Sequence, residues 1–219
     1  MESINYLSTY QNEYLKYLLA GDHRECSKLI QKFTAKENDF KILYEEVIRD
    51  SLYEVGKLWE MNKISVASEH LASSIVEANL NELYPSIISS EKLERTAIVT
   101  CIESEMHQIG IKMAADVLEM QGWNVHFLGA NTPTHDLFTF VRAIKPNLLG
   151  VSLSIYSNMP TLEKILKISH AEFPNLRVLV GGQAFQHGGE EVIKKYPNVV
   201  FKANLKELNE YITNNLNNA

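Results

Sequence analysis

The hydrophobic pattern of the chain changes near residue 94, and this change limits the folds open to it. After this point, short runs rich in Val, Ile and Leu alternate with amphipathic stretches, which is typical of repeated strand–helix units around a parallel sheet. We predict strands over residues 97–101, 124–128, 148–152, 177–180 and 198–201. Helices of roughly 10 to 15 residues should follow each strand, beginning near residues 108, 134, 159, 189 and 206. Residues 94–219 are therefore predicted to form an α/β domain with a five-stranded parallel sheet.

Residues 4–84 lack a strand pattern, and their apolar residues recur at helical spacing. One stripe consists of Leu43, Val47, Ile48, Leu52, Val55, Leu58 and Trp59. Breaks near residues 21–22, 36–38 and 62–63 divide this half into about four helices, with Ser65 as the expected N-cap of the last. Short connections between four helices predict an N-terminal four-helix bundle over residues 1–88. The stretch 85–94 mixes proline, serine and charges and is expected to be a linker.

Composition excludes several functional classes. The formal net charge of −6 argues against direct nucleic-acid binding, which needs a basic surface to displace counterions from phosphates. No apolar run reaches the roughly 18 residues of a membrane helix, and no export signal is present, so we expect a cytoplasmic protein without membrane association. Cys26 and Cys101 stand apart without C-x-x-C spacing, so both thiols are expected to be reduced.

Ligands of Rossmann-like (flavodoxin-like) sheets bind beyond the carboxyl ends of the strands, which draws attention to the loop after the first strand. That loop carries the pattern E-x-H-x-x-G, formed by Glu105, Met106, His107, Gln108, Ile109 and Gly110. A lone histidine in such a loop is more often a solvated or helix-capping residue than a ligand. The pattern gains its weight from two others farther along the chain.

Those two patterns end the third and fourth predicted strands. Ser152-Leu153-Ser154 follows Gly110 after 41 intervening residues, and Gly181-Gly182 follows Ser154 after 26. Taken alone, the glycine pair could form a tight turn and Ser152 could be an ordinary strand-end hydroxyl. Together with the histidine loop they favour a single ligand site at one edge of the sheet.

This set of motifs resembles the cobalamin-binding domain family, whose members carry [DE]-x-H-x-x-G, S-x-[LVT] and G-G at similar spacings. The resemblance covers nearly all of residues 94–219. It implies that the nucleotide base of cobalamin leaves the cobalt and that His107 replaces it as the lower axial ligand, with Glu105 fixing the imidazole tautomer. Gly110, Gly181 and Gly182 would let the backbone approach the nucleotide tail, and Ser152 would contact its benzimidazole.

Three positions depart from the family pattern. Glu105 stands where many members have Asp, Ser154 stands where Leu is common, and Gln108 stands where methyl-carrying members usually have Asp. These departures weaken the identification with corrinoid methyl carriers more than they weaken cobalamin binding.

A second group of residues lies in the helical half, where nine residues separate Trp59 from Glu69-His70. A helix-terminal tryptophan usually packs in a core, and an adjacent Glu-His pair is usually solvated. The combination W-x9-E-H is similar to the cap of the adenosylcobalamin-dependent light sensors of carotenoid-gene control. That resemblance implies that Trp59 covers the upper face of the corrin beside Glu69 and His70, and that light shifts the cap by removing the upper ligand.

Two differences separate the chain from well-known members of that sensor group. Glu60 follows Trp59 where those members have a histidine that binds cobalt after photolysis. Only the helical bundle precedes the sheet, whereas those sensors also carry an N-terminal helix-turn-helix domain. A signal would therefore pass through a protein partner or a change of homo-oligomer.

We expect a cobalamin-binding sensor or regulator that is not an enzyme and has no catalytic residues. Adenosylcobalamin is the expected cofactor, with methylcobalamin or hydroxocobalamin as the other forms. The alternative is a corrinoid protein that carries methyl groups within a methyltransferase system. Binding of another tetrapyrrole, or loss of the cofactor, is a third and weaker hypothesis. Nucleotide binding is the weakest, because neither G-x-G-x-x-G nor G-x-x-x-x-G-K-[ST] follows the first strand.

Overall fold

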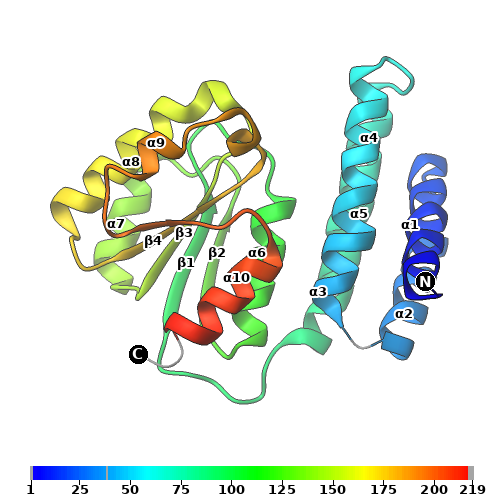
Figure 1. The fold of residues 1–219 in the computed structure, drawn as a ribbon, viewed down its shortest axis with the longest axis horizontal. Helices are drawn as coiled ribbons and strands as arrows, with labels where there is room; N and C mark the ends of the chain where they lie inside the picture. Colours follow the sequence, from blue (N-terminus) through cyan, green and yellow to red (C-terminus); the bar gives the residue numbers. More distant parts are fainter. Residues whose placement is uncertain (1, 38, 217–219) are drawn as a thin grey trace. The chain divides into compact units, whose positions relative to one another are not determined.

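The computed structural model describes residues 2–37 and 39–216. The chain divides into two compact units, Met1–Ile87 and Ile88–Ala219. The first unit is helical, and the second is built around a parallel sheet (Figure 1). This confirms the predicted fold class. In the described part of the chain, no helix combines the length and the apolar character that crossing a membrane requires.

The helical unit contains the four predicted helices, one of which is irregular. They are α1 Glu2–Ala20, α2 His23–Glu37, a continuous helix made of α3 Phe40–Ile42, the π-helical segment Leu43–Arg49 and α4 Asp50–Glu60, and α5 Val66–Ile87. The Ser65 hydroxyl accepts a hydrogen bond from the Ser68 amide at 3.1 Å, which confirms the expected N-cap of α5. Helix α5 runs past Pro85 into the stretch predicted as a linker, because Leu83 and Ile87 are both buried and extend the apolar face of the helix.

The core of this unit is closed by α1 against the other helices of the bundle. Tyr14, Phe33 and Tyr44 are fully buried. The Tyr14 hydroxyl donates a hydrogen bond to Asn79 Oδ1 at 2.9 Å, which ties α1 to α5 and satisfies a polar group that would otherwise be costly to bury.

The second unit contains a five-stranded parallel sheet with the order β2-β1-β3-β4-β5. Its strands are β1 Thr96–Cys101, β2 Asn124–Gly129, β3 Leu148–Ser152, β4 Arg177–Gly181 and β5 Val199–Phe201. Each lies within one residue of its predicted limits at both ends. Every residue of β3 is buried, as are all of β1 after Thr96, as expected for strands covered on both faces.

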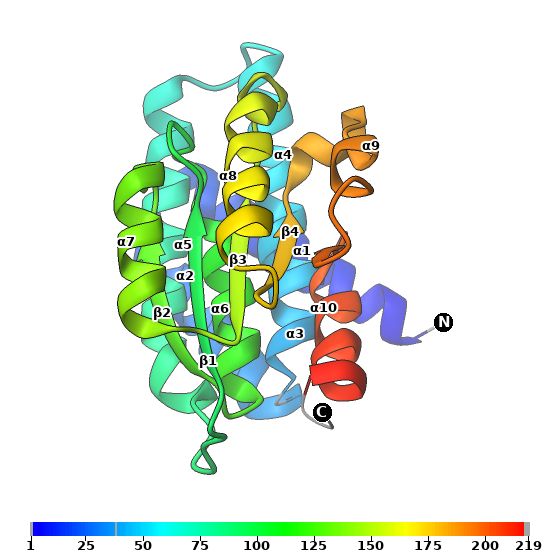
Figure 2. The same cartoon turned by 90° about the vertical axis from the view of Figure 1, so that its left-hand side faces the viewer.

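Helices cover both faces of this sheet (Figure 2). They are α6 Ile109–Met120, α7 Thr134–Ile144, α8 Met159–Glu172, α9 Glu190–Ile193 and α10 Leu205–Tyr211, with short 3-10 segments at Tyr156–Asn158 and Gln183–His187 and a π-helical segment at Ile212–Leu216. Helices α7, α8 and α9 contribute to one hydrophobic core with the central strands, whereas α6 and α10 contact each other. Helix α9 has four residues, so the predicted length of about 10 to 15 residues is wrong for it, whereas α10 continues directly into the π-helical segment Ile212–Leu216 and agrees with the prediction. The two glycines before α9 and Pro197 soon after it leave little room for a longer helix.

Candidate functional site

Three motif-bearing loops leave the same edge of the sheet side by side. Cys101 at the end of β1 pairs with Ser152 at the end of β3, and Ser152 pairs in turn with Gly181 at the end of β4. The β-branched and aliphatic composition of these strands suits their burial on both faces of the sheet. The structure therefore brings together the E-x-H-x-x-G loop, Ser152 and the glycine pair, which lie far apart in the sequence.

The loop after β1 is closed by hydrogen bonds from other loops at this edge. The Glu103 carboxylate accepts bonds from the amide (3.3 Å) and the hydroxyl (2.9 Å) of Thr134 at the start of α7. These bonds lower the pKa of Glu103. The Ser104 carbonyl accepts a bond from the Asn158 side chain at 3.3 Å. The loop is thus attached to the start of α7 through the Glu103 side chain and to the 3-10 segment after β3 through the Ser104 carbonyl.

Glu105 is a fully buried carboxylate with four hydrogen-bond donors. Its Oε2 accepts bonds from the Ser154 amide (2.8 Å) and the Ile155 amide (2.9 Å) after β3. Its Oε1 accepts bonds from the amide (3.1 Å) and from Nδ1 (2.5 Å) of His107. Burial alone would raise the pKa of Glu105, but the bonds from His107, Ile155 and Ser154 outweigh it and lower the pKa to about 2. The buried group is therefore an anion that points an acceptor at the imidazole.

His107 presents its ring to solvent while Glu105 holds one of its nitrogens. The His107 side chain is 58% exposed, whereas the partner carboxylate is 0% exposed. Because the carboxylate accepts at Nδ1, the neutral ring carries its proton there, and Nε2 is the nitrogen whose lone pair suits a metal. The neighbouring Met106 is also exposed. An exposed imidazole with its tautomer fixed from behind can serve as a single axial ligand.

The remaining residues of this motif begin helix α6. Gln108 stands at the N-cap position without a side-chain capping bond, and its Oε1 lies 3.0 Å from where a Cβ on Gly129 would stand. Ile109 and Gly110 form the first turn. A Cβ added to Gly110 would meet no protein atom within 4 Å, so packing within the described chain does not require glycine at this position.

The serines after β3 contribute in two ways. Ser152, the last residue of β3, is 4% exposed. Ser154 acts through its backbone amide, which donates to Glu105. A serine hydroxyl at the carboxyl end of a strand can donate to or accept from a polar atom of a ligand.

The glycine pair after β4 is explained partly by the protein itself. Gly182 has φ of +117°, and a Cβ there would lie 2.1 Å from the Leu153 carbonyl oxygen. A Cβ on Gly181 would lie 3.2 Å from the Lys202 carbonyl oxygen. We expected glycine here so that the backbone could approach a nucleotide tail. Glycine at position 182 is also required by the protein itself, because the loops after β3 and β4 approach each other closely.

The residues predicted as a cap lie at the end of the bundle where α4 connects to α5. Trp59, in the last turn of α4, is 46% exposed, so the ordinary core role does not apply. In the first turns of α5, Glu69 Oε2 lies 2.7 Å from His70 Nδ1, and Glu69 Oε1 accepts a bond from the Ser73 hydroxyl at 2.9 Å. The apolar residues Met61, Val66 and Leu71 are also exposed around this end. The bundle thus carries an apolar surface next to a hydrogen-bonded Glu–His pair at one tip.

The donor set fits a cobalt corrinoid, whose ring supplies its own equatorial ligands. The β1 loop offers one imidazole with a fixed tautomer, Ser152 offers a hydroxyl at the end of β3, and the space beside Gly110 is open. In the part of the chain that the structure describes, no group of three or more His, Cys, Asp or Glu residues could hold a bare metal ion. The residues present therefore suit a metal complex that needs only one ligand from the protein.

Sequence reasoning missed the residues that hold the β1 loop from outside. They are Thr134, Asn158 and above all Asn131, whose amide donates to the Glu105 carbonyl at 2.9 Å. The available signal was their position, since Asn131 and Thr134 follow β2 and Asn158 follows β3 at the ligand-binding edge. Polar residues in those loops can be found from the strand assignment, but their partners cannot.

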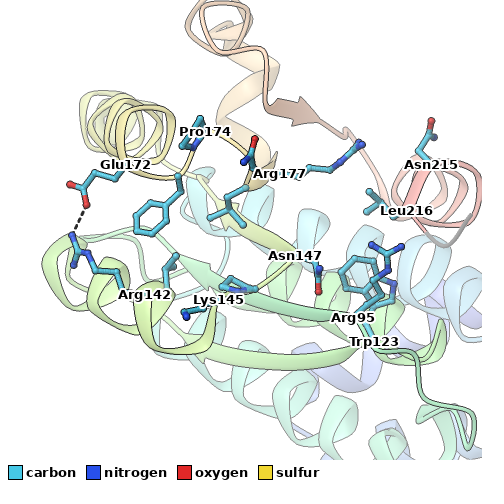
Figure 3. A pocket seen from close by; sticks show the side chains of 15 residues that line it. Arg95, Trp123, Arg142, Lys145, Asn147, Glu172, Pro174, Arg177, Asn215 and Leu216 are labelled. Carbon is cyan, nitrogen blue, oxygen red and sulfur yellow. Dashed lines mark hydrogen bonds and ion pairs between the residues drawn. The ribbon is translucent and has the colours of Figure 1, made fainter. Parts of the chain in front are cut away.

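A separate hollow of about 660 Å³ opens at the amino-terminal ends of the strands (Figure 3). Arg95, Asn147 and Arg177, which line it, precede or begin β1, β3 and β4. Two of its cations have protein partners, since Arg142 pairs with Glu172 at 2.6 Å and Arg177 donates to the Tyr211 hydroxyl at 3.0 Å. The hollow lies at the opposite edge of the sheet from His107 and contains none of the predicted site residues.

Both units of the chain match known protein-family models. A family model described as the B12 binding domain matches residues 95–204, and a second model with that description matches residues 10–84.

Individual relatives fall into two functional groups. The HTH-type transcriptional repressor CarH of Myxococcus xanthus is 30% identical over 177 residues, which cover 80% of this chain and 58% of that protein. Dimethylamine corrinoid protein 1 of Methanosarcina acetivorans is 22% identical over 174 residues, covering 75% of this chain and 81% of the relative. Thus the chain spans less than two thirds of the repressor and most of the corrinoid protein.

A solved structure shares the fold of the whole chain. The monomethylamine corrinoid protein of Methanosarcina barkeri superposes with a TM-score of 0.80 at 14% identity, covering 93% of this chain and 96% of that one. At this identity the likeness concerns architecture alone, namely a helical unit followed by a five-stranded parallel sheet.

Proposed function

This chain belongs to the B12-binding domain family, and from that premise we propose that it is a sensory or regulatory cobalamin-binding protein that responds to light. It would take adenosylcobalamin with the nucleotide base off the cobalt and change state when the upper ligand is lost. The observation that carries the binding mode is the buried Glu105 carboxylate that holds His107 Nδ1 at 2.5 Å while the ring stays exposed.

Each motif residue then has a separate task. When bound, adenosylcobalamin supplies a cobalt–carbon bond that visible light can break. His107 would donate the Nε2 lone pair to the cobalt, and Glu105 would keep the proton on Nδ1 and raise the basicity of the ring. The Ser152 hydroxyl would bond to the benzimidazole, beside the backbone of Gly181 and Gly182.

The sensory part of the proposal depends on the tip of the bundle. Trp59 offers an exposed aromatic ring, and the Glu69–His70 pair offers polar groups beside it. A surface that packs on the upper ligand would no longer be held in place after that ligand leaves. The resulting change can be no larger than the difference in binding free energy between the two ligand states. The 30% identity to a repressor over 80% of this chain supports this choice.

Spectroscopy of the reconstituted protein tests the proposal. Protein loaded with adenosylcobalamin should show the spectrum of an alkylcobalamin without its base in the dark, and green light should convert it. His107→Ala should weaken binding by about tenfold or more, or restore the form with the base bound. His135→Ala, which removes an exposed histidine at the start of α7, should leave binding unchanged. Wild-type protein that retains no cobalamin, or holds it with the benzimidazole still on the metal, would contradict the binding mode.

A corrinoid methyl carrier is the second candidate. The observation that favours it is the extent of the match, because the chain covers 81% of a dimethylamine corrinoid protein. On this alternative, His107 and Glu105 keep their tasks, and the tip of the bundle meets a methyltransferase. A holoprotein that is stable to light but passes methyl groups to a partner enzyme would put the carrier function first.

A further inference from the structure

Two residues of the histidine-bearing edge share an uncommon backbone conformation. Ser104, in the loop after β1, has φ of +69°, and Asn131, in the loop after β2, has φ of +52°. Side chains other than glycine rarely adopt this left-handed region, and asparagine tolerates it better than most. Ser104 directly precedes Glu105 in the chain, and the Asn131 amide is hydrogen-bonded to the Glu105 carbonyl. Both left-handed residues therefore lie at the candidate site.

The two left-handed residues are joined by hydrogen bonds. The Ser104 amide donates to Asn131 Oδ1 at 2.8 Å, and the Asn131 amide donates to the Glu105 carbonyl at 2.9 Å. Asn131 therefore accepts one hydrogen bond from the Ser104–Glu105 segment through its side chain and donates another to it through its backbone. A further side-chain contact to this segment's backbone, from Asn158 Nδ2 to the Ser104 carbonyl, is longer at 3.3 Å.

Glu105 connects Asn131 to His107 through hydrogen bonds. Its backbone is held by Asn131, and its carboxylate holds both the amide and Nδ1 of His107. Since the hydrogen bonds form a continuous chain, a change in the β2–α7 loop can alter the position of the imidazole without touching it.

We propose that Asn131 is a positioning residue for the axial histidine, acting through the backbone of Glu105. This inference rests on the proposed function, in which His107 binds the cobalt. Asn131 meets two requirements at once, because it tolerates the left-handed conformation and supplies an acceptor to the Ser104 amide. Glycine meets only the first requirement, aspartate meets both, and alanine meets neither.

The test measures which nitrogen binds the metal in the full-length protein. Protein labelled with 15N-histidine is loaded with cob(II)alamin, whose unpaired electron couples to the axial nitrogen. A 15N ligand splits the electron paramagnetic resonance lines into doublets, whereas the 14N benzimidazole splits them into triplets. The doublet fraction therefore reports histidine coordination separately from the amount of cobalamin bound.

A matched set of variants removes or keeps the acceptor of the Asn131 side chain. Asn131→Gly and Asn131→Ala should lower the doublet fraction and weaken cobalamin binding by about tenfold, while Asn131→Asp should resemble the wild type. Asn147→Ala is the control, because Asn147 Oδ1 accepts an equivalent bond from the Thr96 amide at 2.8 Å at the opposite edge of the sheet. It should leave the doublet fraction unchanged.

The possible failures are distinguishable. Wild-type protein without the doublet contradicts the proposed function, and the inference falls with it. Wild-type protein with the doublet, together with folded Asn131→Gly that keeps it in full, contradicts the role of Asn131 alone. If Asn131→Gly does not fold, Asn131→Asp decides, since loss of the doublet in that folded variant also overturns the inference.

Discussion

Individual glycines in this protein meet different physical demands. Gly182 is required by the fold, because φ is +117° and a side chain would overlap the Leu153 carbonyl. Gly110 and Gly56 lie in helices with no atom within 4 Å of an added Cβ, so each carries only the conformational cost of glycine in a helix. Gly56 lies in the bundle, whereas Gly110 lies three residues after His107. A ligand in the open space beside Gly110 would explain why glycine is present there.

This difference yields a prediction for Gly110→Ala. The variant without cobalamin should be more stable than the wild type by about 0.5 kcal/mol, because alanine restricts the unfolded chain and favours helix. Cobalamin affinity should nevertheless fall, since the added methyl group would occupy ligand space. Gly56→Ala should raise the stability by a similar amount and leave affinity unchanged. Urea unfolding and equilibrium titration measure the two quantities, and an undiminished affinity in Gly110→Ala would show that no ligand reaches this turn.

At the scale of elements, the sequence predicts what burial and periodicity control. Strands β1 and β3 are recognisable because both faces are buried, and the register of their ends then places Ser152 and Gly181 beside the histidine loop. Periodicity cannot distinguish the π-helical segment Leu43–Arg49 from regular helix, since Leu43, Tyr44, Val47 and Ile48 are buried in either case. It also cannot reveal that Asn131 holds Glu105, because that hydrogen bond joins two loops through backbone atoms in an uncommon conformation.

The exposed tip of α4 and α5 supports a prediction about the upper ligand. Trp59→Ala should change the stability of the protein without cobalamin by less than about 0.5 kcal/mol, since the side chain is 46% exposed. The affinity for adenosylcobalamin should fall by up to about tenfold more than that for hydroxocobalamin, because burying the exposed half of the ring against a ligand contributes at most roughly 1.4 kcal/mol. Ile42→Ala, at the other end of the same continuous helix and 37% exposed, is the control. Equal losses for both cobalamins would argue against a cap that touches the upper ligand.

For the molecule as a whole, binding and signalling are linked by the same free energies. Any ligand that binds the folded state stabilises it by mass action, with about 2.7 kcal/mol gained at a ligand concentration 100 times the dissociation constant. Two cobalamin forms that bind alike would populate the same conformations and carry no signal, however tightly they bind. A sensor therefore requires that the adenosyl and photolysed forms differ in their preference for two states of the protein, whereas a methyl carrier requires that its upper ligand be transferred.

The last prediction follows from that requirement. Protein loaded with adenosylcobalamin in the dark should change either its subunit number or its radius after green light, as measured by light scattering and small-angle X-ray scattering. Protein loaded with hydroxocobalamin should show one state that does not respond, because it has no light-sensitive upper ligand. Trp59→Ala should reduce the change, since this variant has no indole ring to pack on the adenosyl group in the dark state. A mass and radius that stay constant after complete photolysis would contradict the sensor proposal. This result would favour the methyl carrier, in which His107, held by Glu105, binds the cobalt in the same way but no conformational change is needed.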